Sequence, residues 1–153
     1  MNHFVEIKVV NPVLTKEYDL PKYVTSGSAG LDVRACISEP VVVEPQQVIV
    51  IPTGFSINIG RSDIMAMIVP RSGLGFRGLV LGNLTGIIDS DFQGEIKISV
   101  WNRTIDSTFT IEPFERICQM IFVPVLQVSL KLVNEFSLTT ERCQNGFGHS
   151  GTK

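Results

Sequence analysis

Asp89 and Asp91 stand in a polar stretch between two apolar runs in the sequence GIIDSDFQGEIKISVWN, residues 86–102. A carboxylate in such a place can take a proton from a water molecule and make that water a nucleophile. Turn chemistry is the other interpretation, because Asp is favoured in turns where its side chain bonds the nearby main chain. Taken alone, the stretch leaves both interpretations open.

A second stretch, PRSGLG at residues 70–75, contains the parts of an anion-binding cradle. Arg71 supplies a guanidinium, Ser72 supplies a hydroxyl, and Gly73 lets a ligand approach the main chain closely. The glycine and lysine spacing of a P-loop is missing, so the sequence does not indicate a Walker-type site. An ordinary glycine-containing turn with a solvated arginine explains this stretch equally well.

Two further stretches place polar residues beside strand-like runs. Asp32 follows a small-residue turn in SAGLDVRA (28–35), and Gln119 interrupts an apolar run in ERICQMIF (115–122). Asp32 is either a turn residue or a ligand-facing carboxylate. Gln119 is either a polar residue on the solvent side of an edge strand or a ligand-facing amide.

The end of the sequence, RCQNGFGHSGTK, is polar and rich in glycine. Such a composition cannot form a core, and a frayed terminus without function is the simplest interpretation. However, the stretch contains a cation in Arg142, a flat ring in Phe147, main-chain amides around Gly148 and a hydroxyl in Ser150. These groups are what a loop needs in order to wrap a nucleotide.

Short β-type runs must position these residues. In residues 96–101, Ile96, Ile98 and Val100 alternate with polar residues or Trp101, which is the period of a half-buried strand. Together with the run that ends at Ile88, this pattern predicts a β-hairpin with Asp89 at its tip. Strand-like runs elsewhere cover residues 4–10, 41–43, 48–51, 55–59, 64–69, 78–82, 107–111, 117–123 and 125–133. Turn signals separate the runs, which favours a single-domain all-β sandwich or barrel.

The composition narrows the classes of function. The chain has 153 residues, 44% of them hydrophobic, and a formal net charge of -2, so we expect one globular domain without a general nucleic-acid-binding surface. Its three cysteines form no close pair, which argues against a disulfide framework or a zinc site and favours the cytoplasm. The amino-terminal stretch lacks the features of a signal peptide, and no run is long enough to span a membrane.

Individually these stretches are unspecific, but their order is specific. AGLDVRA, PRSGLG, GNLTGIIDSDFQGE, ERICQMIF and GFGHSG follow one another between residues 29 and 151. This series resembles the five ordered motifs of the trimeric dUTPases, and it is similar to the bacterial type. The resemblance implies an all-β, jelly-roll-like β-barrel core at residues 1–136. It also implies a flexible carboxy-terminal arm at 137–153 that closes on the nucleotide.

The resemblance implies a role for each matching residue in recognition of the nucleoside and in catalysis. Asp89 matches the catalytic aspartate that activates the attacking water. Asn83 matches the position that reads the edge of uracil, and Phe92 matches the aromatic residue that packs against the deoxyribose. In the arm, Phe147 matches the ring that stacks on uracil, and Gly148 lies beside it.

The resemblance also implies how the triphosphate is held. The matching positions are Arg71, Ser72, Gly73, Gln119, Arg142 and Ser150. Asp32 matches the aspartate near Mg²⁺ and its waters, so its contact with the metal is expected to pass through water. The implied assembly is a homotrimer with shared active sites.

Three departures from the family pattern stand out. The aromatic residue after residues 89–91 is usually Tyr in this family and is Phe92 here. Phe92 keeps the ring but lacks the hydroxyl. Cys143 and Asn145 replace two arm glycines and narrow the conformations open to the main chain. His149 stands where Ser or Thr is usual, a variant associated with bacterial members.

The sequence therefore predicts an enzyme that hydrolyses dUTP to dUMP and pyrophosphate with Mg²⁺. By resemblance, this reaction keeps uracil out of DNA and supplies dUMP for dTMP synthesis. Two alternatives stay open. One is a dCTP deaminase-like enzyme of the same fold, and the other is a nucleotide-binding regulator without turnover. No nucleic-acid or membrane partner is expected.

Overall fold

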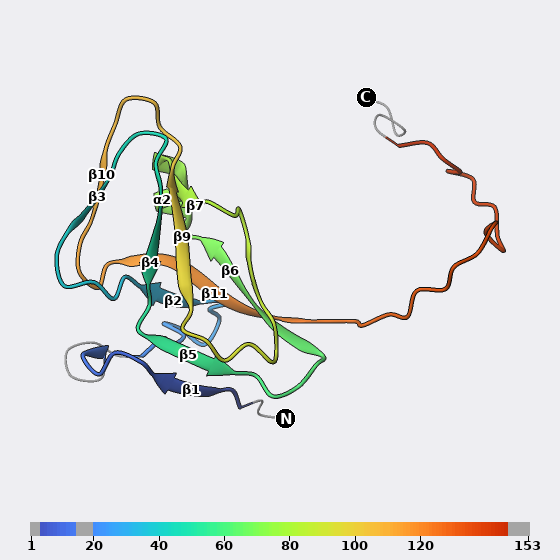
Figure 1. Cartoon of the computed structure of the whole chain (residues 1–153), viewed down its shortest axis with the longest axis horizontal. Helices are drawn as coiled ribbons and strands as arrows, with labels where there is room; N and C mark the ends of the chain where they lie inside the picture. The colour runs from blue at the N-terminus through green and yellow to red at the C-terminus, as the bar shows by residue number, and fades with distance from the viewer. Residues whose placement is uncertain (1–3, 15–19, 147–153) are drawn as a thin grey trace.

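The computed structural model describes residues 4–14 and 20–146 of the chain. Short strands dominate it, and they follow the expected runs closely (Figure 1). The elements are β1 (Glu6–Val9), β2 (Leu31–Arg34), β3 (Val41–Val43), β4 (Val48–Pro52), β5 (Phe55–Asn58), β6 (Ile64–Pro70), α2 (Ser72–Arg77), β7 (Leu79–Leu81), β8 (Gly86–Ile88), β9 (Lys97–Asn102), β10 (Phe109–Ile111) and β11 (Arg116–Pro124).

The strands form several small sheets. The largest has the order β2-β11-β6-β8, a second has the order β4-β9-β7, and β1 with β5 and β3 with β10 form antiparallel pairs. The all-β, jelly-roll-like fold is confirmed. The expected barrel is not closed among the described residues, because these hydrogen-bonded sheets remain separate from one another.

The predicted alternation of buried and exposed side chains is confirmed in β9. Ile98, Val100 and Asn102 are buried, whereas Lys97, Ser99 and Trp101 are exposed or half-buried. Ile98 and Val100 join a continuous apolar core with residues such as Phe55 and Ile111. Because side chains on a strand alternate between its faces, one face of the β4-β9-β7 sheet packs on this core.

The predicted β-hairpin around Asp89 is wrong. Strand β8 pairs with β6 in the four-stranded sheet, while β9 pairs with β4 and β7 in the three-stranded sheet. Residues 89–96 are therefore a connection between two sheets, called here the β8–β9 connection. The apolar pattern on both sides of Asp89 indicated two strands correctly, but such a pattern does not say which strands pair.

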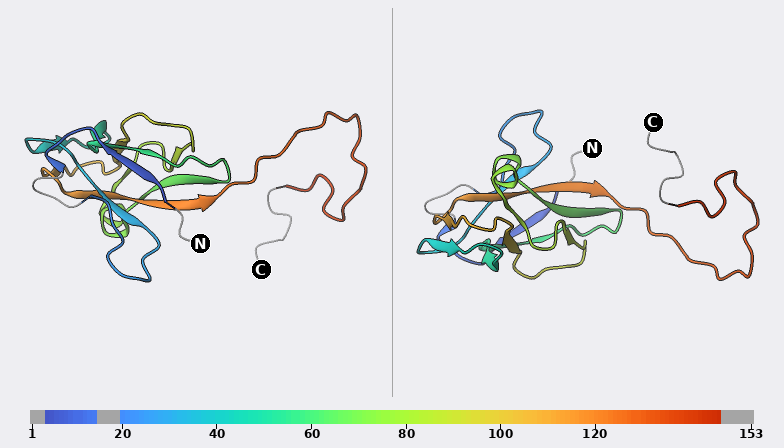
Figure 2. Two further views of the ribbon diagram at one scale, coloured as in Figure 1. Left: turned by 90° about the horizontal axis from the view of Figure 1, so that it is seen from below. Right: turned by 90° about the horizontal axis from the view of Figure 1, so that it is seen from above.

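The prediction of a strand at residues 125–133 is also wrong. Beyond β11, residues 125–146 contain no strand and run away from the sheets (Figures 1 and 2). Leu126, Val128, Leu130 and Leu132 keep a strand-like alternation, yet all four side chains are exposed. A strand needs a hydrogen-bonding neighbour, and the described part of this chain supplies none for them. The domain boundary at residue 136 remains a prediction.

Candidate functional site

Asp32, Arg71 and Arg116 form an ion-pair cluster at one end of the four-stranded sheet. Strand β11 pairs with β2 on one side and with β6 on the other, with Gln119 opposite Asp32 and Cys118 opposite Pro70. The central position of β11 thus brings together side chains from three distant parts of the sequence.

The carboxylate of Asp32 contacts both arginines. Its Oδ1 lies 3.1 Å from Nε of Arg71, and its Oδ2 lies 3.0 Å from an amino group of Arg116. Arg71 also donates a hydrogen bond to the main-chain carbonyl of Arg116 at 3.2 Å. The carboxylate side chain is 19% exposed, whereas the side chains of Arg71 and Arg116 are 35% and 43% exposed, so only the carboxylate is shielded from water.

A cavity of about 510 Å³ opens beside this cluster and contains most of the predicted phosphate-binding residues. Its lining comprises Asp32, Arg71, Ser72, Gly73, Leu74, Arg77, Glu115 and Gln119. Ser72 and Gly73 are exposed, and a side chain added at Gly73 would meet no atom within 4 Å. The main chain at Gly73 therefore faces open space that a ligand can enter.

Glycine also makes room for a ligand-facing amide. A Cβ atom added at Gly30 would lie 3.1 Å from Oε1 of Gln119 and equally close to Ile121. The absence of a side chain at Gly30 therefore leaves room for the side chain of Gln119, which lines the cavity. Gly30 belongs to the motif AGLDVRA, but the motif alone does not predict this contact.

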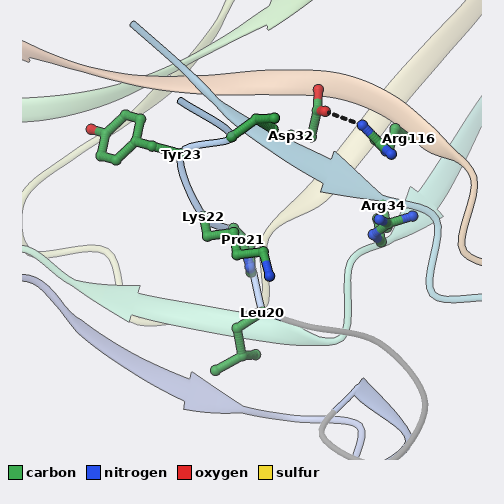
Figure 3. Close-up of a pocket in the computed structure, with 8 residues that line it drawn as sticks. Leu20, Pro21, Lys22, Tyr23, Asp32, Arg34 and Arg116 are labelled. Carbon is green, nitrogen blue, oxygen red and sulfur yellow. Dashed lines mark hydrogen bonds and ion pairs between the residues drawn. The ribbon is translucent and has the colours of Figure 1, made fainter. Parts of the chain in front are cut away.

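A second cavity, of about 330 Å³, shares Asp32 and Arg116 with the cluster (Figure 3). Residues 20–24 line it together with Arg34, which donates a hydrogen bond to the carbonyl of Phe114 at 2.9 Å. No role was predicted for Arg116, which lies within the motif ERICQMIF. Its exposed position beside Asp32 depends on the β2–β11 register, which no local pattern reveals.

The charged side chains that line the first cavity carry no net formal charge. Arg71 and Arg77 supply two positive charges to its lining, and Asp32 and Glu115 supply two negative charges. Arg77 in addition lies 5.8 Å from the ring centre of Phe109, as in a cation–π contact. Because a triphosphate carries several negative charges, further positive charge is needed for this cavity to hold one.

Cys118 lies buried behind the cluster. Burial, together with a smaller effect of the charge of Asp32 and against an opposing effect of Arg71, raises the pKa of its thiol to about 12. Burial, followed by the charge of Glu95, likewise raises the pKa of the Cys36 thiol, while a hydrogen bond with Asn11 lowers it. Both thiols are therefore protonated and unreactive near neutral pH.

Asn83, Asp89 and Phe92 are not among the residues that line this cavity. Asn83 is exposed in the turn between β7 and β8, and Asp89 and Phe92 are exposed in the β8–β9 connection. Asp89 directly follows Ile88, which pairs with Ala66, whereas Arg71 directly follows β6 at its other end. If the β6–β8 register is continued by one residue, Asp89 lies beside residue 65. Residue 65 is six residues from Arg71, which is about 20 Å along the strand.

The arm residue Arg142 is exposed, and its Nε donates a hydrogen bond to the carbonyl of Asn145 at 3.0 Å. Cys143, which replaces a family glycine, has a positive φ of 45°. This conformation favours glycine, so the substitution places strain at a position where the family pattern has none. Phe147, Gly148 and Ser150 lie outside the described residues.

Two findings concern absences in the described part of the chain. Residues 4–14 and 20–146 contain no group of three or more His, Cys, Asp or Glu side chains arranged to hold a metal ion. Within the same residues, no helix is both long and apolar enough to cross a membrane.

Comparisons with known proteins give a consistent result. A family model described as dUTPase matches residues 16–151. A deoxyuridine 5'-triphosphate nucleotidohydrolase from Escherichia coli (strain K12 / DH10B) is 54% identical over 148 residues, which is 96% of this chain and 97% of that protein. The dUTPase of Staphylococcus bacteriophage 80alpha, solved with dUPNHPP, has a TM-score of 0.85 at 28% identity over 98% of this chain and 99% of that one.

A mutant dUTPase from phage phi11 of S. aureus shares the fold, with a TM-score of 0.76 at 24% identity. The match covers 88% of this chain and 99% of that one, and the work on that protein describes the coordination of a structural Mg(II) ion.

Proposed function

This chain belongs to the dUTPase family and is an enzyme that hydrolyses dUTP, and from that premise we propose how its residues divide the reaction between them. Asp89 takes a proton from a water molecule. The water oxygen forms a bond to the α-phosphorus, and the bond from that phosphorus to the oxygen bridging the α and β phosphates breaks. The bond's electron pair leaves with pyrophosphate, and dUMP remains.

The cavity beside Asp32 holds the phosphate chain. Arg71 offers its guanidinium, Ser72 its hydroxyl and main chain, Gly73 an unobstructed main chain, and Gln119 its amide. Because the formal charges of the cavity lining cancel, the triphosphate requires further cations. Arg142 and Ser150 of the arm reach the phosphates in this proposal, and Arg142 adds one positive charge.

Bound Mg²⁺ would supply the remaining charge. The protein's donor set fits a metal held mainly by the substrate, because Asp32 already accepts contacts from Arg71 and Arg116 on its two oxygens. Direct coordination by Asp32 would have to displace an arginine, whereas contact through a water molecule would not. When bound, Mg²⁺ would neutralise and polarise the phosphoryl oxygens.

Each active site is shared between copies of a homotrimer. The observation that carries this part is the separation of about 20 Å along β6 between the positions of Asp89 and Arg71, which is too far for one α-phosphate to contact both. A second copy can instead place its Asp89 beside the phosphate cavity. The exposed apolar alternation at residues 126–132 supports further contacts between copies.

Recognition of the nucleoside lies with the exposed residues. Asn83 and the main chain around it read uracil, Phe92 packs against C2′ of deoxyribose and excludes a 2′-hydroxyl, and Phe147 with Gly148 covers the base. The three free thiols of Cys36, Cys118 and Cys143 are compatible with a reducing compartment, which supports a cytoplasmic location. In the cell, the reaction keeps uracil out of DNA and provides dUMP.

Complementation between two inactive variants tests the shared site. Asp89→Asn and Arg71→Ala proteins are each expected to release little pyrophosphate from dUTP. When they are mixed, unfolded and refolded together, some sites combine an intact Asp89 from one copy with an intact Arg71 from another. Random mixing restores about one quarter of the sites, because each intact residue is contributed with even odds.

Refolded single variants serve as controls, and ammonia release from dCTP is measured alongside pyrophosphate. If the mixture is no more active than the two variants refolded separately, each site lies within one chain and the shared-site proposal fails. Ammonia release without pyrophosphate release would contradict the hydrolytic reaction itself.

A further inference from the structure

Gly94 is in close contact with the ring of Phe92. A Cβ atom added at Gly94 would lie 2.7 Å from Cζ, 3.0 Å from Cε2 and 3.5 Å from Cε1 of that ring, and these are its three nearest atoms. Gly94 does not have a positive φ, unlike Gly54, Gly60 and Gly78. The main chain at residue 94 thus suits other amino acids, and the ring alone occupies the space of a side chain.

Hydrogen bonds hold the main chain on both sides of this contact. The N–H of Ile96 donates to the carbonyl of Phe55 at 3.0 Å, and the side chain of Glu95 accepts a bond from the N–H of Gly54 at 2.9 Å. Toward the other side, the N–H of Phe92 donates to the carbonyl of Asp89 at 3.1 Å. The main-chain bonds made by Phe92 and Ile96 therefore oppose a shift of the main chain that would make room for a methyl group at residue 94.

The Phe92 side chain can move instead, because it is 43% exposed. A methyl group on residue 94 would push the ring away from the main chain and into the open space on its other side. The ring would then no longer stand at the place that Gly94 allows it to occupy.

We infer that Gly94 is a positioning residue that sets where the Phe92 ring stands against the sugar of the nucleotide. This inference rests on the proposed role of Phe92 in excluding a 2′-hydroxyl. Gly94 contacts no substrate in this account and acts through the ring alone. A displaced ring crowds the deoxyribose and loses its fit to C2′. We therefore expect kcat/KM for dUTP to fall by a larger factor than kcat/KM for UTP, which is already low.

A double-mutant cycle separates this role from general disruption. Gly94→Ala, Phe92→Ala and the double variant are compared with the parent for kcat/KM on dUTP and UTP. Gly27→Ala is the matched control, since a Cβ at Gly27 meets no atom within 4 Å and the residue has no positive φ. We expect Gly94→Ala to lower kcat/KM for dUTP by about tenfold or more and to raise the UTP/dUTP ratio.

In the Phe92→Ala background the ring is absent, so adding Gly94→Ala should change kcat/KM for dUTP by less than about twofold. The melting temperature of each variant provides a second measurement, and any loss in Gly94→Ala should be recovered in the double variant. The inference is overturned if Gly94→Ala behaves like Gly27→Ala, or if its effect persists undiminished without the ring.

The proposed role of Phe92 has its own readout in the same experiment. If Phe92→Ala leaves the UTP/dUTP ratio unchanged, the sugar-discrimination role fails, and so does the sugar part of the inference. Coupling between Gly94 and Phe92 in dUTP hydrolysis would still be visible in that case, so the two failures are distinguishable.

Discussion

The main-chain N–H of Phe92 donates a hydrogen bond to the carbonyl oxygen of Asp89, at 3.1 Å. This bond closes a turn that contains both the proposed base and the proposed sugar sensor. Because the bond uses only main-chain atoms, replacing the Asp89 side chain should leave the turn intact. Loss of chemistry can therefore be separated from loss of shape.

Asp89→Asn should abolish most turnover while leaving nucleotide binding largely unchanged. Removal of a general base typically costs about 10²–10⁴ in rate. Steady-state kcat for dUTP and calorimetric affinity for a non-hydrolysable analogue measure the two effects separately. Asp91→Asn is the matched control, since it removes a carboxylate from the same connection and should lower kcat far less. An Asp89→Asn enzyme with parental kcat would remove the residue from the mechanism.

Truncation after Leu138 should leave the melting temperature nearly unchanged and should reduce turnover by about 100-fold or more. Residues 139–146 are exposed, so their removal takes no apolar surface out of the core. The truncation removes Arg142, Phe147 and Ser150 together, and with them the proposed closing contacts. A pyrophosphate assay beside a thermal melt checks both parts. Near-parental turnover would mean that the terminus has no part in catalysis.

Gly54→Ala should lower the free energy of unfolding by about 2–4 kcal/mol, as measured by urea denaturation. Gly54 has a φ of +77°, and an added Cβ would lie 2.7 Å from Sγ of Cys36 and 2.9 Å from Leu14. Gly60→Ala is a matched control, because Gly60 has a φ of +70° but open space around it. The control should lose only about 1–2 kcal/mol. Equal losses in the two variants would contradict the packing part of this account.

Cys118 should make stability fall at alkaline pH. Its pKa in the folded protein is about 12, compared with an ordinary value of 9.0, so between these values the unfolded chain releases a proton that the folded chain keeps. The free energy of unfolding then decreases by up to about 1.4 kcal/mol per pH unit as pH rises. Cys118→Ala loses packing at every pH, but its stability should depend less steeply on pH across this range. Parallel slopes for the parent and Cys118→Ala would disprove the linkage.

The sequence predicted strands better than it predicted their partners. The alternation of Ile98 and Val100 marked β9 correctly. The same kind of alternation at Leu126 to Leu132 lacks a partner strand in the described chain. Periodicity reports which faces of a strand differ in polarity, and pairing depends on contacts far away in the sequence.

In the candidate site too, single residues were predicted from motifs, whereas the contacts between them were not. Asp32, Arg71 and Gln119 were recognised from motifs, and the structure brings them to one cavity. The ion pair between Asp32 and Arg116 was not foreseen, because it depends on the register of β2 against β11. The distance between Asp89 and that cavity also follows from strand pairing, so no motif could have revealed it.

The exposed segment after β11 tethers Arg142 to the folded sheets. From Pro124 to Arg142 the chain spans 18 residues, which reach at most about 60 Å when fully extended. A flexible linker of this kind presents its end group at an effective concentration in the millimolar range. The proposed closure of the arm would therefore need only individually weak contacts, which would also let product leave readily. A detached peptide of the same residues, added at micromolar concentration, would be too dilute to replace it.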